Sequence, residues 1–301
     1  MVELSRYKDR PMLVLKTGML EAGFLYQDGG KMATLKDVND GTEFLSQTEG
    51  EKYLHLEYDG DYVASECSGF DDMFPTIDPY TPQSGLLEGR TYPDHGEICR
   101  VQMTNDVKRT GMTFTYRSDE FKYTYQKSVY PLKDGSIEIK YHIANQSTEP
   151  FSCLWAGHCM LQGIDGAKIF TSYPAQTPRV QMFGPDDIDP DMLSPDSLTG
   201  FVPDEGHTYK FYYLERMPEG RFGVLYPDGK RLTFRTDPSK VPFLGVWLNN
   251  GGFKGIYNMA LEPCTAPYDA PDRAQTHGFP SMLRPGGTLD FSIRISLETG
   301  I

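Results

Sequence analysis

The sequence predicts an all-β protein, built as one large antiparallel β-sandwich with few short helices, and three observations support this. Apolar and polar residues alternate with a period of two along several segments, as in strands with one buried face. Glycine and proline are abundant, at 30 and 22 of 301 residues, and follow no collagen-like period, so they indicate turns. The 19 tyrosines and 17 phenylalanines favour strands.

The alternation predicts two hairpins and a final strand. Residues 121–129 and 137–143 alternate on either side of a Lys-Asp-Gly-Ser turn. A second hairpin joins residues 223–226 to 231–235 across Pro-Asp-Gly-Lys. Residues 289–297 repeat the alternating pattern and predict a strand near the end of the chain.

Other segments complete the predicted organisation. The best candidate for a short helix is 36–47, since Pro and Gly interrupt most other windows. Residues 183–206 are acidic and proline-rich, and predicted strands flank them, so we interpret them as a long loop within one domain spanning 1–301. Further strands are expected at 12–16, 98–104, 112–116, 151–158, 168–171, 210–214, 243–248 and 256–262.

Charge and cysteine content limit the classes of function. There are 29 Lys and Arg against 42 Asp and Glu, for a net charge of −13, which disfavours binding to nucleic acid or to an anionic membrane. No apolar run approaches the roughly 18 residues that span a bilayer, and the first residues lack a signal-peptide core. The five cysteines are odd in number and irregularly spaced, which favours reduced thiols and a cytoplasmic location.

Three segments carry residues suited to chemistry, and the first contains His95. This histidine lies between Asp94 and Gly96 in a predicted turn that precedes a strand. A loop histidine beside carboxylates can bind a polar ligand or shuttle a proton near neutral pH. A solvated turn residue would show the same pattern.

The second and third segments place His158 and Glu262 at the ends of predicted strands. Period two puts Ala156 on the same side as His158, which is either a hydrogen-bonded core residue or a pocket residue. It likewise puts Asn258 and Ala260 on the face of Glu262. A carboxylate on an apolar strand is costly unless it is paired or functional, and burial would raise its pKa towards that of a general base. The alternative is a carboxylate that reaches solvent at the strand end.

Other chemistries lack their motifs. There is no Cys-x-x-Cys, His-Glu-x-x-His or His-x-His, so no metal is expected. The Gly-x-Ser-x-Gly elbow and the phosphate-binding glycine loops are also missing, so no nucleotide cofactor is expected.

At these segments the chain resembles the aldose 1-epimerase (galactose mutarotase-like) superfamily. The resemblance covers nearly the whole chain, and the motifs that carry it are Gly-Phe-Asp-Asp-Met-Phe-Pro from 69, Pro-Asp-His-Gly-Glu from 93, the strand leading to His158, Trp-Leu-Asn-Asn-Gly-Gly from 247, Leu-Glu-Pro from 261 and Leu-Arg-Pro-Gly-Gly from 283. The resemblance implies a β-supersandwich with a sugar site on a concave sheet face. It also implies cofactor-free interconversion of the α- and β-anomers of an aldose.

The resemblance implies a role for each matching residue. Glu262 matches the general base that takes the proton of the sugar C1 hydroxyl, His158 the general acid that protonates the ring oxygen, and His95 a second histidine that binds the sugar. Asp72, Trp247 and Asn250 are further candidates for substrate binding.

The chain also departs from the pattern of the family. Asp71 and Asp72 stand where galactose mutarotases carry an arginine, and Asp204 is a candidate for the family's sugar-binding aspartate. These departures affect the expected sugar more than the expected fold. Arg90, Arg100 or Lys210 could meet a phosphate on a phosphorylated sugar.

Two other functions stay open at this point. A non-catalytic carbohydrate-binding or sugar-sensing protein would keep the pocket without a tuned acid–base pair. A glycoside-cleaving enzyme would need two carboxylates, for which Asp72 or Asp94 could join Glu262. The expected partner is a small-molecule sugar, and the protein is expected to be a monomer or a homodimer.

Overall fold

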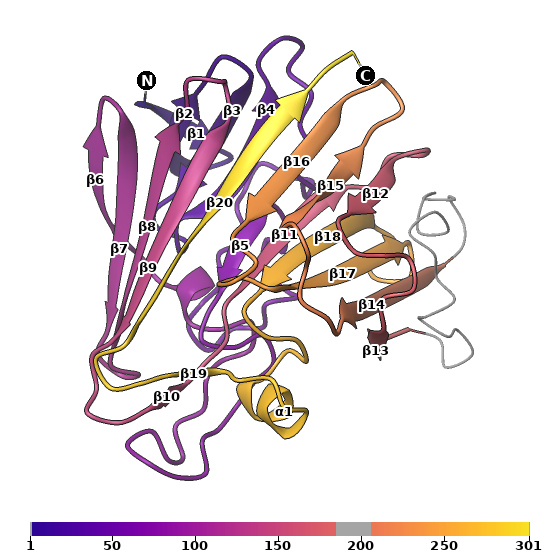
Figure 1. The fold of residues 1–301 in the computed structure, drawn as a ribbon. Helices are drawn as coiled ribbons and strands as arrows, with labels where there is room; N and C mark the ends of the chain where they lie inside the picture. Colours follow the sequence, from indigo (N-terminus) through magenta and orange to yellow (C-terminus); the bar gives the residue numbers. More distant parts are fainter. Residues whose placement is uncertain (1, 185–205, 301) are drawn as a thin grey trace.

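The computed structural model describes residues 2–184 and 206–300, which form two large antiparallel sheets (Figure 1). The first sheet contains ten strands in the order β1-β2-β3-β4-β5-β11-β18-β17-β14-β13. Their bounds are β1 Val2–Tyr7, β2 Arg10–Lys16, β3 Leu20–Leu25, β4 Lys31–Asp37, β5 Phe70–Met73, β11 Ala156–Gln162, β13 Arg179–Phe183, β14 His207–Tyr213, β17 Phe243–Asn250 and β18 Tyr257–Cys264.

The second sheet contains eight strands in the order β12-β15-β16-β20-β9-β8-β7-β6. Their bounds are β6 Thr104–Lys108, β7 Gly111–Ser118, β8 Tyr123–Pro131, β9 Ile137–Asn145, β12 Lys168–Thr171, β15 Arg221–Leu225, β16 Arg231–Thr236 and β20 Thr288–Glu298. The smaller elements are the pair β10 Phe151–Ser152 and β19 Met282–Leu283, the 3-10 turn Ile98–Arg100 and the helix α1 Pro271–Thr276. None of the helices in the described residues has the length and apolar character needed to cross a membrane.

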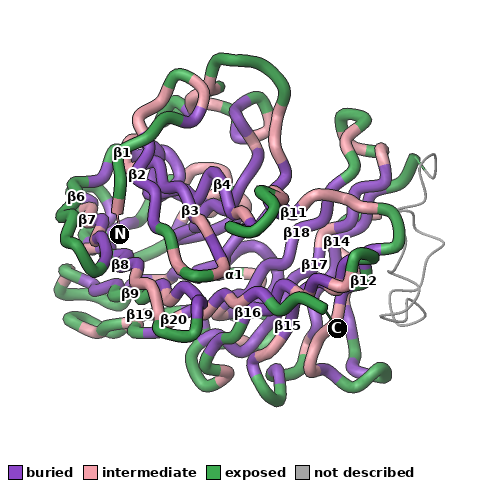
Figure 2. The backbone as a smooth tube through the Cα atoms, turned by 90° about the horizontal axis from the view of Figure 1, so that it is seen from above, coloured by how far each residue is buried: buried purple, intermediate pink, exposed green. Residues whose placement is uncertain are grey.

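The core lies between the two sheets. Alternate side chains of both sheets join one apolar cluster, and Figure 2 shows buried segments along the strands and exposed segments in the surrounding loops. Trp155 is among the largest fully buried side chains, and its Nε1 donates a hydrogen bond of 3.0 Å to the hydroxyl of Tyr125 on β8. A buried ion pair of 2.8 Å joins Asp72 on β5 to Lys127 on β8, so a polar contact as well as apolar packing connects the sheets.

The structure confirms the all-β antiparallel fold and both hairpins. Strand β8 pairs with β9 from Tyr123 and Asn145 to Pro131 and Ile137, and β15 pairs with β16. The predicted strand over 151–158 is divided between β10 and the start of β11.

Two predicted elements are wrong. Residues 36–47 form no helix: β4 ends at Asp37, and the chain reverses so that Lys36 bridges Glu43. The reason is the Asn-Asp-Gly sequence from 39 to 41, in which Gly41 adopts a φ of 75° that favours a turn. Residues 98–104 are not a strand either, because a 3-10 turn occupies Ile98–Arg100 and β6 begins only at Thr104.

Candidate active site

Three strands of the ten-stranded sheet carry the central groups of the site. Strands β11 and β18 are neighbours, and Cys159 pairs with Leu261, both with side chains in the core between the sheets. Because side chains alternate across a strand, His158 and Glu262 face the opposite side of the sheet, away from this core. Period two had placed each residue only relative to neighbours on its own strand; the pairing of β11 with β18 brings the two onto one face.

Glu262 is fully buried and lies close to two other titratable groups. Its Oε1 is 3.8 Å from Nε2 of His158, and its Oε2 is 3.2 Å from Nζ of Lys210 on β14. Neither carboxylate oxygen has a hydrogen-bond partner within the described part of the chain. Burial raises the pKa of Glu262, while the positive charge of Lys210 opposes that rise. Such a carboxyl group is suited to exchanging protons rather than to stabilising the fold.

A glycine lets Lys210 approach Glu262 across an intervening strand. Gly245 on β17 pairs with Glu262 on one side and with Tyr212 on the other. A Cβ at this position would meet the Tyr212 ring at 2.6 Å. Because Gly245 adds no side chain between β18 and β14, a lysine on β14 can reach the carboxylate.

His158 is buried beside aromatic rings. Only 7% of the residue is exposed, and its Nδ1 has no hydrogen-bond partner among the described residues. The rings of Tyr62 and His95 both meet it edge-on, at centroid distances of 5.9 and 5.7 Å. Burial, with further contributions from the charges of His95 and Lys210, holds the pKa of His158 well below its usual value. The imidazole therefore favours its neutral form unless a neighbouring carboxyl group, such as that of Glu262, is ionised.

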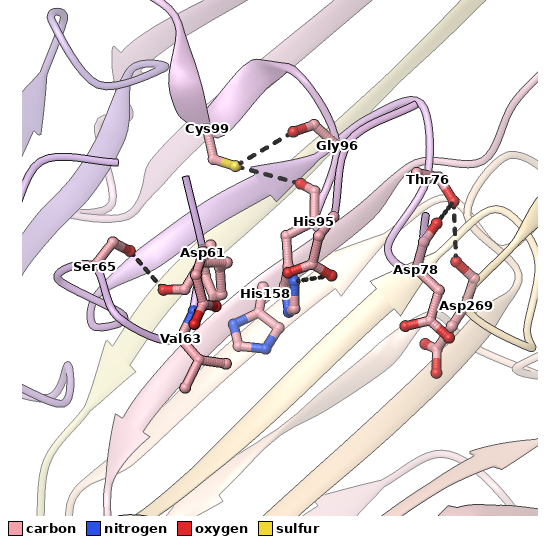
Figure 3. Close-up of polar contacts among 12 residues, drawn as sticks. Asp61, Val63, Ser65, Thr76, Asp78, His95, Gly96, Cys99, His158 and Asp269 are labelled. Atoms are coloured by element: carbon pink, nitrogen blue, oxygen red, sulfur yellow. Dashed lines mark hydrogen bonds and ion pairs between the residues drawn. The ribbon is translucent and has the colours of Figure 1, made fainter. Parts of the chain in front are cut away.

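His95 reaches the site from a loop. Its ring stacks on Tyr62 at 3.9 Å, and its Nδ1 lies 3.0 Å from Asp94. Figure 3 shows the His95 and His158 rings beside each other, with the thiol of Cys99 donating to the backbone carbonyl of His95. The His95 backbone has a φ of 58°, a left-handed conformation that histidine adopts more readily than most residues.

These groups surround a cavity of about 280 Å³, close to the lower end of the usual range for small-ligand pockets. His158 and Lys210 line it, whereas Glu262 is fully buried and in contact with both, so Glu262 lies immediately behind them. The remaining polar lining residues are Tyr62, Cys67, Asp78, His95, Asp269 and Arg273, and the apolar wall includes Met160, Met182, Phe183, Trp247 and Phe253.

Lys210 and Arg273, the lysine and arginine in this lining, are both paired with carboxylates. Lys210 lies 2.8 Å from Asp269, and Arg273 pairs with Asp78. Burial alone would raise the pKa of Asp269, but Lys210 reverses the effect and lowers it. Asp269 therefore stays ionised and holds the lysine together with Glu262.

The structure brings four of the predicted site residues together and leaves two elsewhere. His95, His158, Glu262 and Trp247 surround or adjoin the cavity. Asp72 does not, because it faces the core, where it pairs with Lys127 and accepts a hydrogen bond of 2.9 Å from Tyr141. Asn250 is also outside the lining, since alternation along β17 turns it away from the face of Trp247.

Asp204 lies outside the described residues. Among the residues proposed as phosphate ligands, only Lys210 lines the cavity. Arg100 instead donates hydrogen bonds to backbone carbonyls, including that of Gly60, and Arg90 is exposed and donates to the carbonyl of Glu120.

Sequence reasoning missed Tyr62, Asp269 and the pairing of Lys210 with Glu262. One signal was available: Lys210 lies between Tyr209 and Phe211 in an aromatic strand, and a lysine buried in a sheet needs a carboxylate partner. No comparable pattern marks Tyr62 or Asp269. Across the described ranges, no group of three or more His, Cys, Asp or Glu residues is arranged to hold a metal ion.

Comparison with known proteins identifies the fold. No protein family model and no curated protein sequence matches the chain. Solved structures do match: Slr1438 from Synechocystis aligns with a TM-score of 0.70 at 15% identity over 100% of both chains. A galactose mutarotase-like protein from Clostridium acetobutylicum aligns with a TM-score of 0.67 at 16% identity, over 100% of this chain and 99% of its own.

A galactose mutarotase-like protein from Lactobacillus casei also aligns, with a TM-score of 0.65 at 17% identity, over 95% of this chain and 100% of its own. The chain therefore has the galactose mutarotase-like fold along its whole length, as its sequence resemblance implied.

Proposed function

We propose that the protein is an aldose 1-epimerase that interconverts the α- and β-anomers of a sugar by opening and closing its ring. The observation that carries the proposal is the approach of Glu262 to His158, at 3.8 Å, behind the polar floor of a sugar-sized cavity. Both groups are buried, and Nδ1 of His158 and both carboxylate oxygens of Glu262 have no hydrogen-bond partner in the described structure. The likeness of the fold to galactose mutarotase-like proteins supports the proposal.

The proposed reaction moves two protons in opposite directions. Glu262 takes the proton of the C1 hydroxyl while protonated His158 gives its proton to the ring oxygen, and the C1–ring oxygen bond breaks. The open-chain aldehyde rotates about the C1–C2 bond. His158 then removes the proton from the same hydroxyl as it attacks C1 from either face, and Glu262 returns a proton to the aldehyde oxygen. The pair ends with the single proton with which it began.

The charges around the cavity favour an uncharged aldose over a sugar phosphate. Lys210 and Arg273 are already neutralised by carboxylates. A phosphate group would therefore lose its hydration without gaining an unpaired cation in the lining.

Glycoside cleavage is less well supported. That reaction requires two carboxylates on either side of one bond. Asp72 points into the core and Asp94 pairs with His95, so neither joins Glu262 in a catalytic pair.

The test is anomer exchange measured by saturation-transfer NMR with a panel of free and phosphorylated aldoses. Wild type is expected to accelerate exchange of a free aldose, and Glu262→Gln to lose about 10²–10⁴-fold of that rate while still binding the sugar, because glutamine keeps the shape but takes no proton. Glu43→Gln is the matched control, since burial also raises the pKa of Glu43, to about 7, at a position outside the cavity lining. An unchanged rate in Glu262→Gln would reject this residue as the base. Binding without exchange in wild type would instead identify a sugar-binding or sugar-sensing protein.

A further inference from the structure

The Glu262–His158 pair faces an energetic problem that its burial creates. Epimerisation requires one shared proton to lie on His158 when the cyclic sugar reacts and on Glu262 when the open chain recloses. Burial penalises a charged carboxylate and a charged imidazole alike. Burial alone therefore holds the proton on Glu262, and the pair would favour ring closure over ring opening.

Lys210 lies where it can correct this imbalance. Its Nζ is 3.2 Å from Oε2 of Glu262 and therefore stabilises the carboxylate, whereas Oε1 faces His158. The groups that act electrostatically on Glu262 come from all the surrounding elements: His158 on β11, Lys210 and Tyr212 on β14, Cys264 on β18, and His95 and Asp269 on loops. Of these, Lys210 is the one whose charge is positive throughout the physiological pH range.

Asp269 keeps Lys210 both charged and in position. The carboxylate lies 2.8 Å from Nζ and also accepts a 2.5 Å hydrogen bond from the hydroxyl of Tyr212. Its backbone carbonyl accepts from the amides of Ile77 and Asp78, which anchors the loop. Asp269 and Glu262 together raise the pKa of Lys210 despite its burial. The side chain therefore stays an ammonium ion, which cannot attack the transient aldehyde as a free amine would.

From this geometry, and building on the proposed function, we infer that Lys210, held by Asp269, is a positioning residue that balances the two locations of the proton in the Glu262–His158 pair. By binding Oε2, it leaves Oε1 of Glu262 facing His158. It also lowers the free energy of the state in which Glu262 is ionised and His158 is protonated. Lys210 acts through Glu262 and need not touch the sugar.

The first test compares Lys210→Met with Lys210→Arg. Methionine removes the positive charge, so both limbs of the bell-shaped pH profile of kcat/KM are expected to move about 1–3 units higher, and the maximum rate to fall tenfold or more. Arginine restores the charge and is expected to return both limbs to within about half a pH unit of their wild-type positions. Half a unit is about the scatter of such a profile. A uniform loss of rate in Lys210→Met, with both limbs unmoved, would overturn the inference and indicate a merely structural role.

Asp269→Asn supplies a test with the opposite sign. Asparagine keeps an oxygen that can accept from Nζ of Lys210 and from the Tyr212 hydroxyl, so the lysine stays in place while the negative charge is removed, and the acidic limb is expected to move to lower pH. A shift in the same direction as that of Lys210→Met would contradict the inference, and this variant also serves if Lys210→Met fails to fold.

Direct titration separates the inference from the proposed function. In protein labelled with ¹³C at glutamate carboxyls, the signal absent from Glu262→Gln identifies Glu262. Its midpoint is expected at higher pH in Lys210→Met than in wild type, whether or not any sugar exchanges. If no sugar in the panel exchanges in wild type, the epimerase proposal fails; if the Glu262 midpoint is the same in both proteins, the role of Lys210 fails.

Discussion

At the scale of single residues, Glu262 and His158 are placed in a way that contributes little to stability. Nδ1 of His158 and both carboxylate oxygens of Glu262 are buried without a hydrogen-bond partner in the described structure, and each such group costs about 1–3 kcal/mol relative to a satisfied one. Nearby polar groups are treated differently: the hydroxyl of Tyr62 donates to Asp71 at 2.9 Å, and Asp71 pairs with Lys31 at the same distance. Unsatisfied titratable groups beside a cavity are typical of a site arranged for a ligand.

The depressed pKa of His158 predicts how stability depends on pH. Because the folded protein favours the neutral imidazole, protonation below the unfolded-state pKa of about 6.5 favours unfolding. The stability due to neutral His158 is complete above that pH and decreases as pH falls, by at most about 1.4 kcal/mol per unit. His158→Asn should therefore show a shallower loss of unfolding free energy between pH 7 and pH 5, measured by urea denaturation.

The control is His142→Asn. His142 lies on the exposed side of β9 and pairs with Asp290 of β20. In His142→Asn the change of unfolding free energy with pH should stay closer to that of wild type than it does in His158→Asn. Equal slopes in wild type and His158→Asn would show that His158 is protonated as readily in the folded as in the unfolded chain.

At the scale of elements, the site combines rigid strands with loops held by a polar anchor. Arg100 donates hydrogen bonds to carbonyls of the 57–60 loop and of the turn that carries His95. Glu97 accepts from the hydroxyls of Tyr58, Tyr116 and Tyr123. This anchor fixes the two segments whose rings, those of Tyr62 and His95, stack at the cavity.

Arg100→Met tests the anchor. The freed carbonyls are expected to cost about 2–3 kcal/mol of unfolding free energy, and the looser His95 and Tyr62 to raise KM about tenfold with a smaller change in kcat. Steady-state anomer exchange and urea denaturation measure the two effects. Arg90→Met removes an exposed arginine that donates to one carbonyl and should change neither by much; equal effects of the two substitutions would contradict the anchoring role.

What the sequence could predict depends on whether a feature arises from a local pattern or from the order of the strands in the sheet. The hairpins and the shared face of Glu262 and Asn258 follow from alternation, which is local. The 36–47 helix was wrong because the Asn-Asp-Gly turn that begins at residue 39 interrupts the segment. Lys210 meets Glu262 only because β17 lies between β14 and β18 and carries Gly245 at the crossing. Strand order of this kind joins residues far apart in sequence and leaves no local pattern.

At the scale of the whole molecule, the Asp72–Lys127 pair connects the two sheets through the core. Both side chains are fully buried, and Lys127 also donates to the carbonyl of Gly30 at 3.0 Å. The sequence suggested Asp72 as a substrate-binding residue, whereas the structure turns it into the core. The sequence could not indicate which face of β5 it would occupy, because a short buried strand has no exposed side to mark the alternation.

Breaking this pair should weaken the entire fold and spare the chemistry. Lys127→Met leaves a buried carboxylate unpaired and is expected to cost about 3–5 kcal/mol in urea unfolding, whereas the double variant Asp72→Leu with Lys127→Met should recover most of that loss. The kcat of the protein that remains folded is expected to stay close to the wild-type value. A double variant as unstable as the single one would show that packing, rather than the unpaired charge, dominates.

Because β11 and β18 lie inside the ten-stranded sheet, heating is expected to affect the catalytic pair and the ligand-binding loops at different temperatures. Each strand is hydrogen-bonded on both sides, so the amides of His158 and Glu262 exchange with solvent only when the sheet opens as a whole. The segments bearing Tyr62 and His95 lie outside the strands and can open on their own at lower free energy. If the protein acts as proposed, warming is therefore expected to weaken sugar binding first, while His158 and Glu262 keep their relative positions until the sheet unfolds cooperatively.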